Sequence, residues 1–94
     1  MADIWKLTEE LMELDNAVWN DHGFQSRPSG EDRREYLEDV VSRLEDGGYD
    51  PDDIDDDVLE ALEDENFHSL IDALMVFRGD ETVEGLMEDE CRWL

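Results

Sequence analysis

The stretch from Leu44 to Phe77 contains thirteen Asp and Glu residues and no Lys or Arg. Its densest part runs from Asp50 to Glu65, yet apolar residues recur there at helical spacing, as Ile54, Val58 and Leu62. Apolar residues at every third or fourth position form the buried stripe of an amphipathic helix. A disordered acidic segment lacks such a stripe. The pattern therefore predicts a folded, helical surface that displays negative charge.

The charge of the whole chain restricts its partners. Thirty acids against seven Lys and Arg give a formal net charge of −23. Residues 1–47 carry 13 acids and 5 bases, a net of −8, and residues 48–94 carry 17 acids and 2 bases, a net of −15. Nucleic acids and anionic membranes are polyanions, so we expect neither as a direct partner. A basic nucleic-acid-binding protein or complex offers the complementary surface.

Length and cysteine content limit the organisation of the chain. A chain of 94 residues is long enough for one domain, so we expect a single acidic helical domain over 1–94. The single Cys91 excludes an internal disulfide and is typical of a reducing compartment. No apolar run approaches the roughly 20 residues of a membrane span, and no secretory signal begins the chain. These features predict a cytoplasmic protein.

The periodicity predicts an all-α fold, a small irregular bundle of about five short helices. The expected helices cover 3–20 with Asp3 as cap, a segment from Ser29 to Gly47-Gly48, a segment from Pro51 to Asn66 with Asp50 as cap, a segment from Phe67 to Gly79, and a last segment that Asp80 caps. Gly23 is suited to the left-handed conformation that ends the first helix. Arg33, Arg34 and Arg43 lie among acids on the second helix.

The first helix carries two apolar stripes. Ile4, Leu7, Leu11, Leu14 and Val18 form the main one, at the spacing of a buried face. Trp5, Met12 and Trp19 fall seven residues apart and form a flanking stripe. This second stripe has two interpretations. It widens the core face, or it forms a seam for a homodimer or another partner, because Trp and Met are enriched at interfaces.

The sequence gives little support for catalysis or for a resident metal. It contains no Gly-rich phosphate loop, no GxSxG and no HExxH. His22, His68 and Cys91 are isolated, whereas structural zinc sites use paired ligands. Asp53, Asp55 and Asp57 match the first ligands of an EF-hand loop, but Val58 stands where that loop needs Gly and Asp64 where it needs Glu. We therefore expect neither an enzyme nor a cofactor.

The carboxylates themselves are the candidate binding site, and their role would be to present charge to Arg and Lys of a partner. The residues chosen are Asp52, Asp53, Asp55, Asp56, Asp57, Glu60, Glu63 and Asp64. Acids three and four apart lie about 5–6 Å from each other at Cβ on a helix, so they repel, a cost that binding surfaces often carry. A second row on the next helix toward the N-terminus comprises Glu31, Glu35, Glu38 and Asp39.

In composition, size and helicity the chain resembles the acidic DNA-mimic inhibitors of phages and mobile elements, the anti-restriction and anti-CRISPR class. The resemblance implies an inhibitor in the host cytoplasm that occupies the basic nucleic-acid-binding surface of a defence nuclease complex. The alternative is a salt-adapted acidic interaction module from a halophile. The sixteen Asp, the fourteen Glu and the single Lys of the chain suit that alternative as well.

Overall fold

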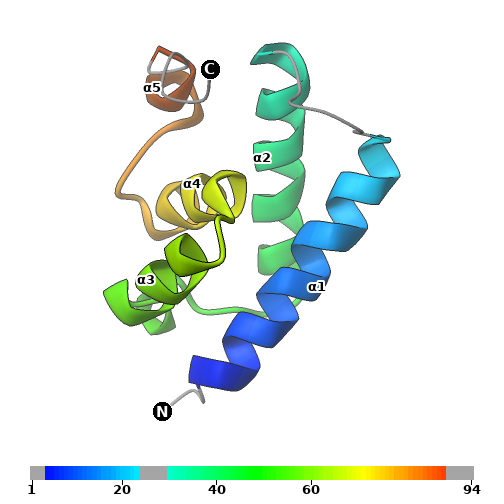
Figure 1. Cartoon of the computed structure of the whole chain (residues 1–94). Coiled ribbons are helices and arrows are strands. Elements are labelled where there is room, and N and C mark those ends of the chain that lie inside the picture. The colour runs from blue at the N-terminus through cyan, green and yellow to red at the C-terminus, as the bar shows by residue number, and fades with distance from the viewer. Residues whose placement is uncertain (1–3, 24–29, 89–94) are drawn as a thin grey trace.

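The computed structural model describes residues 4–23 and 30–88. Within these residues the fold contains five α-helices, one 3₁₀ helix and no strand, which confirms the predicted all-α class (Figure 1). The elements are α1 Ile4–His22, α2 Gly30–Asp46, the 3₁₀ helix η1 Pro51–Asp53, α3 Asp56–Asp64, α4 His68–Arg78 and α5 Val83–Glu88. None of the described helices has the length and apolar character needed to cross a membrane. The predictions for Asp3, Ser29 and Cys91 concern residues outside the described ranges.

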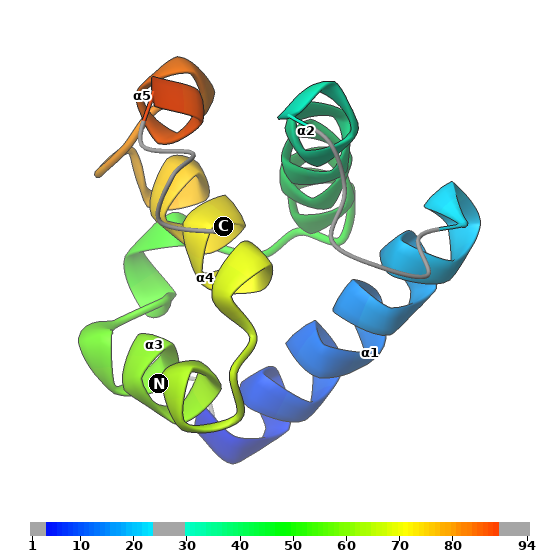
Figure 2. The ribbon, with the colours of Figure 1, turned by 45° about the horizontal axis from the view of Figure 1, so that its top comes forward.

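The helix α4 lies at the centre of the bundle and packs against both α2 and α3 (Figures 1 and 2). Helix α1 packs on α2 and α3, and α5 packs on α2. One apolar cluster joins all five helices: Leu7, Leu11, Val18, Tyr36, Leu37, Val40, Leu44, Ile54, Val58, Leu62, Leu70, Ala73, Leu74 and Leu86. The Cα radius of gyration is 12.4 Å, close to the value of about 12 Å that compact chains of this length have.

Three helices end in the same left-handed turn, at Gly48, Asn66 and Gly79, whose φ angles are 78°, 65° and 85°. In each turn the N–H of the residue after the left-handed one donates to a carbonyl five residues earlier: Tyr49 to Leu44 at 3.1 Å, Phe67 to Leu62 at 3.0 Å, and Asp80 to Met75 at 2.9 Å. This pattern is the Schellman motif, which Gly and Asn adopt most readily. The helix ends predicted at these three positions are confirmed.

The predicted single helix from Pro51 to Asn66 is wrong, because the chain is extended at Ile54 (φ −93°, ψ 94°). Asp50 caps and Pro51 opens only the short η1. The Asp55 side chain then accepts a hydrogen bond from the N–H of Val58 at 3.2 Å, so α3 begins at Asp56. Asp competes in this way for backbone donors and so favours a new helix start. The break also buries Ile54, which is 1% exposed.

The cap predicted for the last helix is also wrong. Thr82, and not Asp80, caps α5, since the Thr82 hydroxyl accepts a hydrogen bond from the N–H of Gly85 at 3.0 Å. Asp80 belongs instead to the turn that ends α4, and its carboxylate pairs with Arg78 at 3.1 Å. The N–H of Asp80 already donates to the carbonyl of Met75 in the turn that ends α4, so the next helix begins farther along the chain.

Arg33 departs from the sequence expectation, because it is buried and does not lie among the surface acids of α2. Its Nη2 donates to the carbonyl oxygen of Leu86 at 3.0 Å and so ties α5 to α2. The spacing to Tyr36, Leu37 and Val40 places Arg33 on the buried face of α2, and this signal was present in the sequence.

Substitutions of Gly79 test how much the left-handed turn after α4 matters for stability. No atom lies within 4 Å of a Cβ built there, so backbone conformation alone opposes a side chain. We expect Gly79→Ala to lower the free energy of unfolding by about 1–2 kcal/mol, and Gly79→Asn to lower it by less, because Asn tolerates this conformation. Urea denaturation followed by circular dichroism measures both. Equal stability of the Ala variant and the wild type would contradict the assignment.

Candidate acidic interface

Every exposed position of α3 is an acid, namely Asp56, Asp57, Glu60, Glu63 and Asp64. Val58 and Leu62 are fully buried on the opposite side of the helix. At about 100° per residue, the five acids fall within one arc of roughly 120°, centred opposite the buried stripe. The structure therefore brings five of the eight predicted site residues together on one helix face.

The other three predicted residues precede this face along the chain. Asp52 and Asp53 lie on η1 and are exposed, and Asp55 stands at the junction as the cap of α3. Asp56 pairs with Arg78 at 3.3 Å, although its side chain remains 94% exposed. Within the described part of the chain, no hydrogen bond or ion pair engages the carboxylates of the remaining six residues: Asp52, Asp53, Asp57, Glu60, Glu63 and Asp64.

The acid face of α3 costs stability that packing offsets. Glu60 has four like-charged neighbours at three or four residues, Asp56, Asp57, Glu63 and Asp64, and each pair costs about 0.2–0.5 kcal/mol. Glu63 and Asp64 also lie in the last turn, where the helix dipole disfavours anions and where α3 has no base. Each fully buried side chain of Ile54, Val58 and Leu62 contributes about 1.5–3 kcal/mol. Burial therefore outweighs a repulsion of roughly 1–2 kcal/mol.

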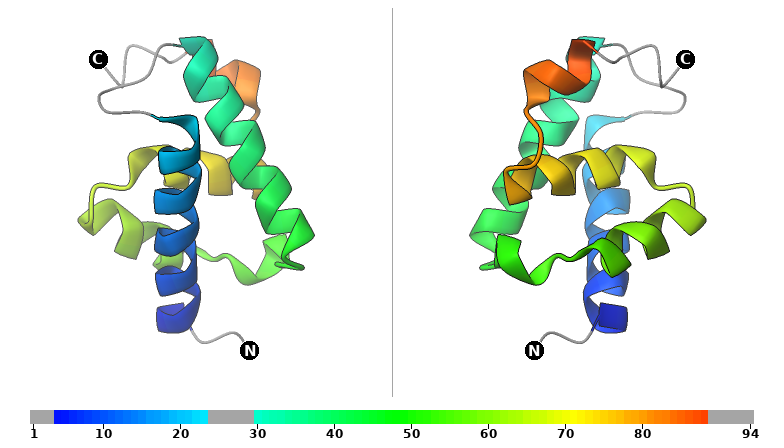
Figure 3. Two further views of the ribbon diagram at one scale, coloured as in Figure 1. Left: turned by 90° about the vertical axis from the view of Figure 1, so that its right-hand side faces the viewer. Right: turned by 90° about the vertical axis from the view of Figure 1, so that its left-hand side faces the viewer.

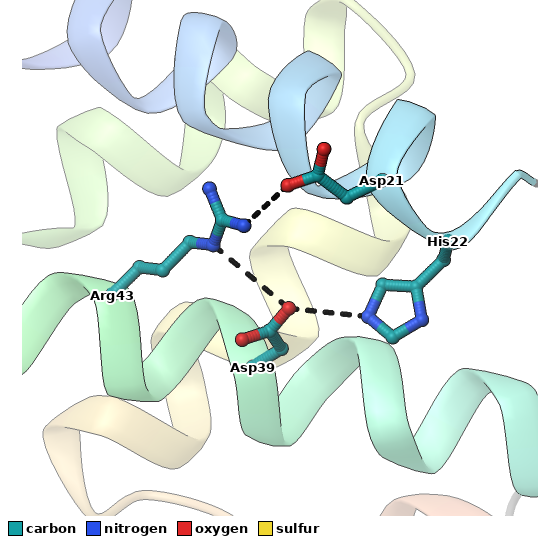
Figure 4. Close-up of polar contacts among 4 residues, drawn as sticks. All are labelled: Asp21, His22, Asp39 and Arg43. Carbon is teal, nitrogen blue, oxygen red and sulfur yellow. Dashed lines mark hydrogen bonds and ion pairs between the residues drawn. The ribbon is translucent and has the colours of Figure 1, made fainter.

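The second candidate row of acids, on α2, differs from the α3 face because basic side chains neutralise part of its charge. Arg34 pairs with Glu38 at 3.2 Å within the helix. Arg43 pairs with Asp21 and lies 3.8 Å from Asp39, while His22 Nε2 lies 3.2 Å from the same Asp39 carboxylate (Figure 4). These contacts join the end of α1 to α2. Two of the four acids in this row therefore serve the scaffold, and the α3 face is the less compensated surface.

The aromatic stripe of α1 does not act as one unit. Met12 and Trp19 pack against the core, and Trp19 meets Tyr36 edge to face with ring centroids 5.4 Å apart. The core interpretation is confirmed for these two residues. It is wrong for Trp5, which is 74% exposed. Two spacings of seven turn by only about 40° around a straight helix, so the two side chains differ mainly in their place along α1: Trp5 lies on its first turn and Trp19 on its last.

The sequence analysis missed two buried acids, Asp15 on α1 and Asp72 on α4. Asp15 is 8% exposed and lines a hollow of about 240 Å³ with His68 and Ser69. Burial raises the pKa of Asp15 from 3.8 to about 6. Its position four residues after Leu11 and three before Val18 places it beside the buried stripe of α1. The helical periodicity therefore indicated that Asp15 is buried, but with thirty acids in the chain a single one did not stand out.

Asp53, Asp55 and Asp57 do not form the start of a calcium loop. Asp55 uses its carboxylate to cap α3, and Asp57 projects from the helix that follows. Across residues 4–23 and 30–88, no three Asp, Glu, His or Cys side chains are grouped closely enough to hold a metal ion. The arrangement on α3 is suited to binding cationic side chains, which need no fixed coordination sphere.

Within the described residues, the fold and the site define a small, all-helical protein with an acidic helix face on which only Asp56 has a basic partner. Comparison of the chain with protein-family models, with curated proteins and with solved structures finds no match.

Asp15 gives a pH-dependent test of this structure. The carboxyl titrates near 3.8 when unfolded and near 6 when folded, so the folded state holds the proton more tightly and ionisation destabilises it. Stability should therefore fall as pH rises from about 4 to 6, by up to about 3 kcal/mol from this group. Asp15→Asn should be more stable than the wild type at pH 7.5 and lose that advantage near pH 4.

Urea denaturation of wild type and Asp15→Asn at pH 4, 6 and 7.5, at one ionic strength, measures the Asp15 effect. The other acids titrate in both proteins, so only the difference between them reports on Asp15. A difference that stays constant over this range would show that Asp15 is not buried as described.

The Asp55 carboxylate has two possible roles, because it caps α3 and also carries a negative charge at the candidate site. Substitutions at this position distinguish the two roles. Asp55→Ala should lower the free energy of unfolding by about 1 kcal/mol, whereas Asp55→Asn should retain most of it, since Asn caps as well as Asp. Thermal melts by circular dichroism compare the two variants. Equal losses in both would mean that the negative charge of Asp55, and not its hydrogen bond to Val58, stabilises α3.

Proposed function

We propose that this protein is a small inhibitor that blocks the nucleic-acid-binding surface of a basic protein by presenting carboxylates in place of phosphates. A defence nuclease complex, as in the anti-restriction and anti-CRISPR class, is the target. The observation that supports this proposal is the face of α3, where every exposed position is an acid and the last turn has no base. Glu63 and Asp64 in the last turn gain no helix stability from the dipole, whereas Asp56 and Asp57 in the first turn do.

The density of charge on α3 is comparable to that of a nucleic acid. A helix of nine residues is about 13.5 Å long, so five acids give one charge per roughly 2.7 Å. B-DNA carries one charge per about 3.4 Å along one strand and per about 1.7 Å along the duplex. The molecule is 36 Å long with a net charge of −23, and a duplex segment of that length carries about 21 charges.

The scaffold gives the display a fixed geometry. The buried residues Val58 and Leu62 hold one side of α3 against the core, so the carboxylates on the other side cannot collapse onto the protein. A preformed array avoids part of the ordering cost that a flexible acidic tail has on binding. Its field also accelerates association with a basic surface, and salt weakens this effect.

Salt adaptation is the second candidate function class, and one observation favours it. Exposed acids also lie on α1 and α2, for example Glu9, Glu13, Glu31 and Glu35, so acidity is not confined to α3. In that case the acids would solvate the protein in concentrated salt, with no partner implied. The two candidates differ in low salt. An inhibitor remains folded at 50 mM NaCl, whereas a salt-adapted domain unfolds without molar salt.

Two matched variants test the inhibitor proposal. The first replaces the free carboxylates by amides on α3 and η1, as Asp53→Asn, Asp57→Asn, Glu60→Gln, Glu63→Gln and Asp64→Asn. The second removes the same number of charges elsewhere, as Glu13→Gln, Glu31→Gln, Glu35→Gln, Glu45→Gln and Asp46→Asn. All ten residues are exposed, so both variants should fold. Immobilised protein is used to capture partners from a bacterial lysate, and bound proteins are eluted with duplex DNA.

We expect the wild type and the second variant to retain a nucleic-acid-binding protein that duplex DNA displaces. The first variant should lose at least about tenfold of the recovered partner, since five charge-assisted contacts are removed. Equal recovery by the two variants would show that net charge, and not the α3 face, determines binding. A partner that duplex DNA fails to displace would contradict mimicry.

A further inference from the structure

Trp5 is, among the residues that the structure describes, the large hydrophobic side chain left exposed. It lies on the first turn of α1, which projects beyond the other helices (Figure 3). Trp5, Ile4 and Thr8 from α1 and Asp57 and Ala61 from α3 line a hollow of about 260 Å³. Single exposed apolar residues are ordinary, but this one belongs to a concave site at the edge of the acid face.

The negative charge around the hollow favours a cationic occupant. Asp57 lines the hollow, and Glu60 and Asp64 continue from it along the exposed side of α3. Lys6, the chain neighbour of Trp5, lines a different hollow with Tyr49 and Asp50. A second copy of this chain, with a net charge of −23, would be repelled from such a face. A cationic side chain with an apolar or planar body is attracted to it.

We propose that the Trp5 hollow receives an arginine side chain of the basic partner, with the guanidinium stacked on the Trp5 indole and paired with the Asp57 carboxylate. The inference rests on the proposed function and adds to it a point of specificity. Arginine stacks on aromatic faces and pairs with carboxylates through a planar fork, whereas lysine is a strongly hydrated point charge. A volume of 260 Å³ is below the range of about 300–1,000 Å³ for drug-sized ligands and suits one side chain.

The hollow would act as an anchor within a wider electrostatic contact. The long-range attraction of helix carboxylates acts on Arg and Lys alike, because it depends on charge alone. Trp and Arg dominate the binding energy of many interfaces when they meet in a pocket surrounded by weaker contacts. Trp5 would therefore determine which basic surface is bound, while the α3 acids raise the rate and strength of association.

Two labelled peptides of equal charge, nona-arginine and nona-lysine, test this anchor by fluorescence anisotropy at 100 mM NaCl. The proteins are the wild type, Trp5→Ala, Trp5→Phe and the amide variant of α3 and η1 described above. We expect the wild type to bind nona-arginine about three- to tenfold more tightly than nona-lysine. Trp5→Ala should bind both peptides with the wild-type affinity for nona-lysine, and Trp5→Phe should retain part of the preference. Trp5 is exposed, so its replacement should not unfold the protein.

The outcomes separate this inference from the proposed function. Equal affinity of the wild type for the two peptides, or an arginine preference that survives in Trp5→Ala, overturns the Trp5 anchor alone. An amide variant that binds both peptides as the wild type does overturns the charge display and, because it carries Asp57→Asn, the pairing of the guanidinium with Asp57, whereas Trp5→Ala reports on the indole alone. If sedimentation shows a wild-type dimer that Trp5→Ala converts to a monomer, the occupant is a second copy and the arginine inference is wrong.

Discussion

The burial of Ile54, Val58 and Leu62 is the interaction on which the display of charge depends. These three side chains fix η1 and α3 to the core that α1, α2 and α4 build. Their burial exceeds the repulsion among the α3 acids severalfold, since each contributes about 1.5–3 kcal/mol and each like-charged pair costs about 0.2–0.5 kcal/mol. A chain with 39% charged residues can therefore hold a short, strongly acidic helix in one orientation.

The positions of the few bases determine where negative charge remains available. Arg43 and Arg34 engage acids of α1, α2 and α5, and Arg33 is committed to the carbonyl of Leu86 in the interior. Of the α3 acids only Asp56 has a partner within the described residues, Arg78. Bases thus join helices to one another, whereas four of the five acids on the α3 face have no basic partner within the described residues. Exposed ion pairs contribute little stability, so their main effect here is on the distribution of charge.

Helical periodicity predicted most of the fold, because period and helix-ending residues are local properties of the sequence. It predicted the all-α class, the helix ends at Gly48 and Gly79, and the exposure of the eight candidate acids. It failed where two local preferences competed. The four-residue spacing of Ile54 and Val58 suggested one helix, but the capping carboxylate of Asp55 started a new one. The exposure of Trp5 depends on where α1 projects past its neighbours, a tertiary property that spacing does not contain.

Carboxyl labelling with a carbodiimide and an amine, read residue by residue by mass spectrometry, tests the central claim most directly. The protein is labelled alone and in complex with the partner that it captures. We expect the partner to protect Asp57, Glu60 and Asp64 on α3, while Glu31 and Glu35 on α2 remain as reactive as in the free protein. Protection of the α2 acids with α3 fully labelled, or no protection at all, would contradict it.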